Sequence, residues 1–176
     1  MLTGVLDIWM MQEHVAEMIV DAEVPKVWRT LHPRRPKGSE LPWRVEYPGG
    51  SIEVIVDGDE AGQGLVRLCT FRVPRYLLSG GLGRSFETII EARVDEISRY
   101  SAVGRPLWSR AEGWHRLEEV GEGRTRLTFC ETYAAYNPVL ARLFERRVHR
   151  FISANNAKAY DGALGRLGPI ERPTPH

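Results

Sequence analysis

One long helical pattern ends a chain whose earlier part is mostly strand-like. From residue 137 or 138 to about residue 167, apolar side chains recur close to every 3.6 residues, which predicts a helix with one buried face. At about 1.5 Å per residue this helix is roughly 45 Å long, enough to cross a whole sheet. Its buried face comprises Val139, Leu140, Leu143, Phe144, Val148, Phe151, Ile152, Asn155 and Ala159.

The segments before this helix predict a series of antiparallel hairpins. A first strand is expected at 14–22, followed by a short helix in which Pro25 occupies the first turn. Residues 32–50 hold four prolines and three glycines and are expected to form a loop with one short helical turn at most. Further strands are expected at 51–56, 64–73, 86–97, 99–103, 109–120 and 125–135.

This order of elements predicts an α+β fold, in which a curved antiparallel sheet of about seven strands wraps around the long helix. One or two short helices follow the first strand. A single helix does not fill a strongly curved sheet, so we expect an apolar cavity between them. Residues 1–176 are expected to form one domain with its core at about 14–167, while 1–13 and 168–176 are terminal extensions and the last of these is frayed.

Composition and charge narrow the possible partners. The 24 basic and 23 acidic residues give a net charge of +1, so no overall field attracts nucleic acid, and none is expected as a partner. No apolar run approaches the roughly 18 residues of a membrane span, so no integral membrane association is expected, and the cytoplasm is the expected location. Cys69 and Cys130 are expected to be reduced thiols in a monomer or weak homodimer.

Several segments together resemble the START-like superfamily, also called SRPBCC, and within it the group of polyketide cyclases, dehydrases and lipid transport proteins. The matching segments are EMIVDAEVPKVWRTL, the Leu41-Pro42-Trp43 run, GQGLVR, GRTRLTF and the terminal helix. The resemblance implies a helix-grip fold whose cavity binds lipids, sterols, polyketides, plant hormones or other apolar molecules. Oxygenases of this superfamily need two histidines and a carboxylate around iron, and no such set is visible, so no metal and no cofactor are expected.

The strand at 125–135 carries candidate catalytic residues. Phe129, Glu131 and Tyr133 share one face by the two-residue period, and the apolar members mark that face as inward. If the turn at 121–123 pairs residue 117 with residue 127, His115 lies opposite Phe129 and Gly113 opposite Glu131. His115, Glu131 and Tyr133 then lie together in the cavity.

Two interpretations of this trio stay open. A histidine near a carboxylate can act as general acid or base, and Tyr133 can polarise a carbonyl, which suits enolisation, aldol cyclisation or dehydration of a polyketide. Alternatively, His115, Glu131 and Tyr133 satisfy one another's hydrogen bonds or hold the polar end of a ligand without reaction.

Other residues are candidates for binding the ligand. Arg67 either faces inward, where it neutralises Glu131 or a ligand carboxylate, or is an exposed strand arginine. A glycine-rich segment with Tyr76 and Leu78 is expected to form a lid over the cavity mouth or, alternatively, a packed turn or a dimer contact. The full candidate set is Arg67, Phe71, Tyr76, Leu78, Thr88, Ile90, Phe129, Phe151 and Asn155.

Three functions are compatible with these features. The first is binding or carriage of a hydrophobic small molecule in the cavity. The second is a polyketide aromatase, cyclase or dehydratase that uses the His115, Glu131 and Tyr133 cluster. The third is a protein-interaction regulator, of toxin or chaperone-regulator type, that acts through the long helix, whose Arg142, Arg146, Arg147 and Arg150 form a basic outer strip or a solvated face.

Overall fold

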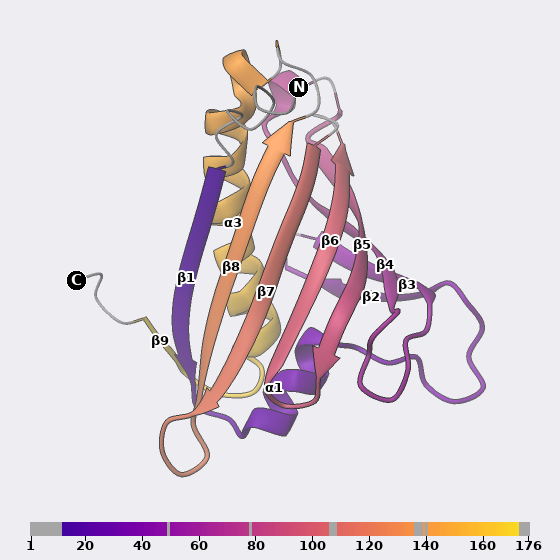
Figure 1. Ribbon diagram of the computed structural model, residues 1–176, viewed down its shortest axis with the longest axis vertical. Coiled ribbons are helices and arrows are strands. Elements are labelled where there is room, and N and C mark those ends of the chain that lie inside the picture. The colour runs from indigo at the N-terminus through magenta and orange to yellow at the C-terminus, as the bar shows by residue number, and fades with distance from the viewer. Residues whose placement is uncertain are drawn as a thin grey trace, which may run out of the picture.

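A single antiparallel sheet dominates the structure (Figure 1). The computed structural model describes residues 12–172 apart from 49, 78, 106–108, 136–138 and 140. In this part of the chain nine strands pair in the order β2-β3-β4-β5-β6-β7-β8-β1-β9. The strands are β1 Gln12–Val20, β2 Trp43–Tyr47, β3 Gly50–Val56, β4 Val66–Arg72, β5 Leu82–Arg93, β6 Ile97–Arg105, β7 Ser109–Glu119, β8 Thr125–Ala135 and β9 Ile170–Glu171.

The helices pack on one face and one end of this sheet. Helix α3, Arg146–Leu164, runs behind the strands in Figure 1, and α1, Val24–Leu31, lies at the end where β7 turns into β8. Short turns of 3-10 helix (η1, Arg75–Leu77) and π-helix (η2, Ala141–Glu145) complete the described elements. Among the described residues, no helix combines the length and the apolar character needed to cross a membrane.

The two-residue period of strand β8 determines which side chains face α3. Thr125, Leu127, Phe129, Glu131 and Tyr133 are all buried, whereas the residues between them are half-buried. The predicted register is confirmed, since residue 117 pairs with 127, residue 115 with 129 and residue 113 with 131. The concave face therefore carries the alternating set that the sequence marks as inward.

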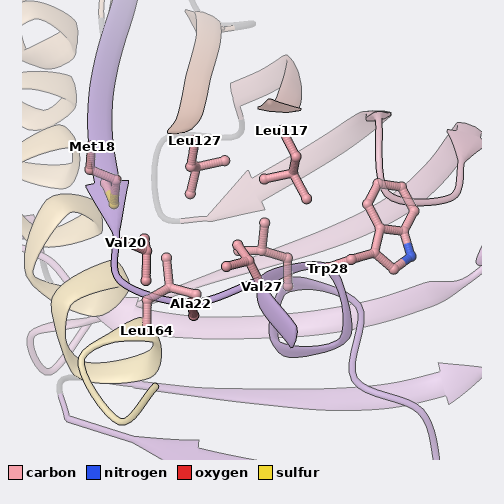
Figure 2. Packing of buried hydrophobic residues seen from close by; sticks show 9 residues of the cluster. Met18, Val20, Ala22, Val27, Trp28, Leu117, Leu127 and Leu164 are labelled. Atoms are coloured by element: carbon pink, nitrogen blue, oxygen red, sulfur yellow. The ribbon is translucent and has the colours of Figure 1, made fainter. Parts of the chain in front are cut away.

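A hydrophobic cluster joins the end of β1 to α1, α3 and the β7–β8 hairpin. Figure 2 shows Val20 beside Leu164 of α3, with Val27 and Trp28 of α1 close to the ends of β7 and β8. The predicted buried face of α1 is confirmed at Val27, Trp28 and Leu31, and Val24 packs against the same cluster. This cluster closes one end of the space between sheet and helix.

Two strands lie where the sequence predicts irregular structure. The sheet has nine strands instead of about seven, because β2 lies inside the predicted loop at 32–50 and β9 inside the predicted frayed tail. The five residues of β2 alternate between half-buried and exposed, so the run carries a strand pattern between its prolines. The two residues of β9 are held by pairing with Val20 and Ile19 at the free edge of β1.

Two further boundaries differ from the predicted ones. Strand β5 already begins at Leu82, so the last four residues of the glycine-rich segment at 75–85 are sheet. The strand ends at Arg93, before a turn in which Asp95 has a φ of +62°. The α-helical part of the last helix begins at Arg146, whereas the predicted start is residue 137 or 138. It ends at Leu164, about three residues before the predicted end. Its 19 residues give a length of about 28 Å, shorter than the roughly 45 Å expected.

The burial pattern of β1 yields a stability test with a matched pair. Val20 is fully buried and Val15 is 55% exposed on the opposite face of the same strand. We expect Val20→Ala to lower the free energy of unfolding by about 2 kcal/mol, since it removes two buried methyl groups and leaves a cavity. Val15→Ala should change it by less than about 0.5 kcal/mol in the same urea titration. Equal effects would contradict this packing.

Candidate functional site

A cavity of about 140 Å³ lies between the concave face of the sheet and α3. Apolar and aromatic side chains form most of its wall, and a few buried polar groups interrupt them. The lining residues are Thr30, Leu31, Tyr47, Ile52, Arg67, Cys69, Phe71, Ser85, Glu87, Tyr100, Gly104, Arg105, Ser109, Ala111, His115, Phe129, Glu131, Tyr133, Val148, His149, Tyr160 and Ala163.

The cavity exists because small residues occupy the middle of one row across the sheet. The pairing register places Glu87 beside Ala102, Ala102 beside Ala111, and Ala111 beside Tyr133. Of these residues Glu87, Ala111 and Tyr133 line the cavity, and the short side chain of Ala111 leaves room beside the larger ones. The hollow thus has Glu87 on one side and Tyr133 on the other.

A buried carboxylate held by two phenols forms one wall, and we name Glu131, Tyr100 and Tyr133 the carboxylate clamp. The Tyr100 hydroxyl donates to Glu131 Oε1 at 2.5 Å, and the Tyr133 hydroxyl donates to Glu131 Oε2. All three residues are at most 6% exposed. Burial, and then the Glu131 charge, raise the pKa of Tyr100, so its phenol keeps its proton.

Gly113 makes this clamp possible. Strand β7 separates Tyr100 on β6 from Glu131 on β8, and Gly113 pairs with both residues. A Cβ atom at residue 113 would lie 2.6 Å from the Tyr100 hydroxyl oxygen and 2.7 Å from the Cys130 carbonyl oxygen. Tyr100 therefore reaches across β7 through space that any other residue would fill.

His115 contacts α3 and not Glu131. Its Nε2 lies 2.6 Å from the Tyr160 hydroxyl of α3, and its Nδ1 lies 3.4 Å from Ser98 Oγ. Burial is the largest cause that holds the pKa of His115 well below its usual value, and the charge of Arg67 lowers it further, so the imidazole is neutral. A neutral imidazole has one N–H donor and one acceptor nitrogen, so the contacts with Tyr160 and Ser98 engage both ring nitrogens.

Arg67 faces inward and pairs with Glu87 on the neighbouring strand. Its Nη2 lies 2.8 Å from Glu87 Oε2, and its Nη1 donates to the Leu31 carbonyl oxygen at 2.9 Å. Burial lowers the pKa of Arg67, but the Glu87 carboxylate outweighs burial and raises it, so the guanidinium stays charged. The expected salt bridge to Glu131 is replaced by one to Glu87, because Glu87 lies directly opposite on β5.

Comparison with solved structures identifies the architecture. A START superfamily protein from Mycobacterium smegmatis matches with a TM-score of 0.60 and 12% identity, over 89% of this chain and 98% of that one. The corresponding values are 0.59, 16%, 89% and 97% for Ara h 8.0201, and 0.57, 17%, 89% and 93% for the Zhui aromatase/cyclase from Streptomyces sp. R1128. The chain has a START-like fold. No family model and no curated protein sequence matches it.

In this START-like fold the three predicted catalytic residues all line the cavity, but only two of them bond to each other. Glu131 and Tyr133 belong to the clamp, whereas His115 bonds to Tyr160. The sequence missed Tyr100, Tyr160 and Glu87, which complete these contacts. Their side chains meet the predicted ones only after β6, α3 and β5 are placed around the curved sheet.

The predicted ligand-binding residues divide into four groups. Arg67, Phe71 and Phe129 line the cavity. Thr88 and Ile90 lie on the other face of β5, since Ser85 and Glu87 are its lining residues, so that prediction chose the wrong alternate set. Tyr76 and Phe151 form the third group, since they are 55% and 36% exposed. The fourth group is Leu78, which lies outside the described residues, and Asn155, whose side chain lies outside them.

Thiols and metal ligands contribute little to this site. Cys69 is a free, buried thiol on the cavity wall, and burial raises its pKa well above the ordinary value, so it is protonated. Cys130 is also free and half-buried. Within the described part of the chain, no three His, Cys, Asp or Glu side chains gather closely enough to hold a metal ion.

The close approach at Gly113 predicts a large effect of one added methyl group. Gly113→Ala should lower the free energy of unfolding by about 1–3 kcal/mol, because the new Cβ overlaps the Tyr100 ring and a backbone carbonyl. The matched control is Gly104→Ala on β6, where the nearest atom to a new Cβ is Ser109 Oγ at an ordinary 3.5 Å. Urea unfolding of both variants measures the difference, and equal effects would disprove this role of Gly113.

Buried neutral histidines predict that acid destabilises the fold. Burial is the largest cause that lowers the pKa of His32 and of His149 to about 4, from 6.5. Below pH 6.5 the unfolded chain therefore binds more protons, and lowering the pH to 5 should cost about 2 kcal/mol for each of these histidines. His149→Phe keeps a ring against Tyr133, whose ring centroid lies 4.2 Å from that of His149. This variant should be destabilised by acid by about 2 kcal/mol less than the parent protein, because it has one buried histidine fewer. Unfolding midpoints at pH 7 and 5 check this, and equal midpoints would refute it.

Proposed function

We propose that this protein binds a hydrophobic small molecule, about one aromatic ring in size, in the cavity between α3 and the sheet. The observation that carries the proposal is the cavity of about 140 Å³, with its largely apolar wall and its buried polar groups. An engineered protein cavity of about 150 Å³ holds benzene, whereas drug-sized ligands occupy roughly 300–1,000 Å³. A single ring therefore fits better than an acyl chain.

The nature of the wall supports a bound molecule over an empty core defect. Ala111 lines the hollow, and the polar groups on its wall are paired, Arg67 with Glu87 and Glu131 with two phenols. An apolar molecule can bind beside these charges, because each charge already has a partner and the ligand does not have to neutralise it. The fold is also that of a START superfamily protein and of an aromatase/cyclase.

Catalysis on the bound molecule is a second candidate function. It is favoured by the position of His115, which lines the cavity and bonds to the Tyr160 hydroxyl, so that a histidine and a phenol lie together at the cavity wall. The reaction type would be cyclisation or dehydration, as in the predicted polyketide chemistry. Cytoplasmic location and a monomeric or weakly dimeric state remain predictions from the sequence.

Binding is tested by filling the cavity. Toluene added to the protein should shift the amide NMR signals of cavity residues in a saturable way, and Ala111→Phe should abolish the shifts because its ring occupies the hollow. Ala154→Phe is the control, since Ala154 is exposed on α3. Mass spectrometry of an organic extract from natively purified protein would identify a ligand that copurifies. Absence of saturable binding to the parent protein would end the proposal.

His115→Leu separates the two candidate functions. The substitution should leave toluene binding within about threefold if the cavity only binds, because it exchanges a neutral ring for an apolar side chain. Once a copurified compound identifies a substrate, conversion that is lost in His115→Leu while binding is kept would support catalysis. Conversion that survives in this variant would exclude His115 from the reaction.

A further inference from the structure

Exposed arginines gather at one end of the sheet, although the whole chain has a net charge of only +1. Residues 72–84 contain three arginines, Arg72, Arg75 and Arg84, and no acidic residue. All three are exposed, and within the described part of the chain none of them forms an ion pair. This segment joins β4 to β5, and β5 begins at the end of the sheet opposite to α1 (Figure 1).

The start of the last helix brings four more arginines to the same end. Arg142 lies in η2, and Arg146, Arg147 and Arg150 follow on the first turns of α3. All four are exposed, whereas Val148 between them is fully buried. Figure 1 shows that α3 begins at the end of the sheet where β5 begins. The positive charge of the two segments therefore lies in one region of the molecule.

A ring contact joins these two segments into one surface. The ring of Tyr76 in η1 packs against that of Phe144 in η2, with 6.2 Å between the centroids. Together, 72–84 and 139–150 hold seven arginines and one acidic residue, Glu145. We name the exposed side chains of these two segments the basic end.

Apolar side chains are exposed among these arginines. Leu143 is 57% exposed, Tyr76 is 55% exposed and Leu82 is 50% exposed. Arginines beside exposed apolar side chains fit an anionic bilayer, because the guanidinium groups meet lipid phosphates while the apolar groups enter the boundary between headgroups and acyl chains. Nucleic acid fits less well, since its backbone would neutralise the arginines and leave the apolar side chains in water.

We infer that the basic end is a docking surface for a bilayer that contains anionic phospholipid. Charge complementarity carries the inference, because the chain as a whole is nearly neutral and its unpaired arginines are concentrated here. The inference goes beyond the proposed function, since docking needs no ligand in the cavity. Binding of a ligand and binding of a bilayer can therefore fail separately.

Vesicle sedimentation tests the contribution of charge. The whole protein should bind vesicles of phosphatidylcholine with about one third phosphatidylserine roughly tenfold or more tightly than vesicles of phosphatidylcholine alone. One arginine at an anionic surface strengthens binding about fivefold, so the double variant Arg146→Gln, Arg147→Gln should bind about 25-fold more weakly. The control Arg29→Gln, Arg34→Gln removes the same charge from exposed positions on and after α1, and should change binding less than about twofold.

The contribution of the apolar side chains needs its own pair of variants. Leu143→Ser should weaken binding to the anionic vesicles about fivefold, because the leucine no longer enters the bilayer. Val94 is 53% exposed in the turn after β5, at the α1 end, so Val94→Ser should leave binding within about twofold. All substituted side chains are exposed, and circular dichroism checks that each variant is folded.

The outcomes are distinct. Tight binding to anionic vesicles that is lost in the Arg146 and Arg147 variant and kept in its control supports the inference. Equal binding to both kinds of vesicle, equal losses in the two double variants, or no binding overturns it. Tighter binding to a DNA duplex of random sequence than to the vesicles, or sedimentation as a dimer that Leu143→Ser dissociates, would also overturn it, because the basic end would then serve another partner.

Discussion

The buried carboxylate of Glu131 is the constraint on which the cavity's architecture depends. A charge inside a folded domain is tolerated only when hydrogen bonds replace the water it loses. Here the replacement comes from Tyr100, two strands away, and from Tyr133 on the same strand. The two aromatic rings and the glycine between the strands serve this need, and the rings form part of the wall of the cavity next to α3.

A second polar pair connects the sheet to the end of α1. Arg67 and Glu87 face each other on neighbouring strands, and the guanidinium also holds the carbonyl oxygen of Leu31, the last residue of α1. On the opposite side, Tyr160 of α3 bonds to His115 of β7. Polar side chains therefore fix both helices to the sheet, while the apolar cluster around Val20 and Leu164 supplies the packing.

The sequence predicted the register of the β7–β8 hairpin correctly, because one short turn and a strict two-residue alternation determine it there. The same alternation failed on β5, where apolar Ile90 lies on the outer face and charged Glu87 on the inner one. Residue type therefore predicts the wrong inward face when a charged side chain, such as Glu87, is buried against a partner of opposite charge. Strand β9 and the contact between His115 and Tyr160 depend on segments distant in sequence, which no local pattern specifies.

Gly113 also restricts how sequences with this arrangement can diverge. The phenol of Tyr100 fills the space in which a side chain at residue 113 would lie, because a Cβ atom there would overlap that ring. The two positions cannot vary independently, so a lineage that gains a side chain at 113 must lose the aromatic ring at 100, either before or together with it. The carboxylate at 131 would then have one donor fewer, so three positions on three strands form one evolutionary unit, and a search for distant relatives gains more from this triplet than from any one of its residues.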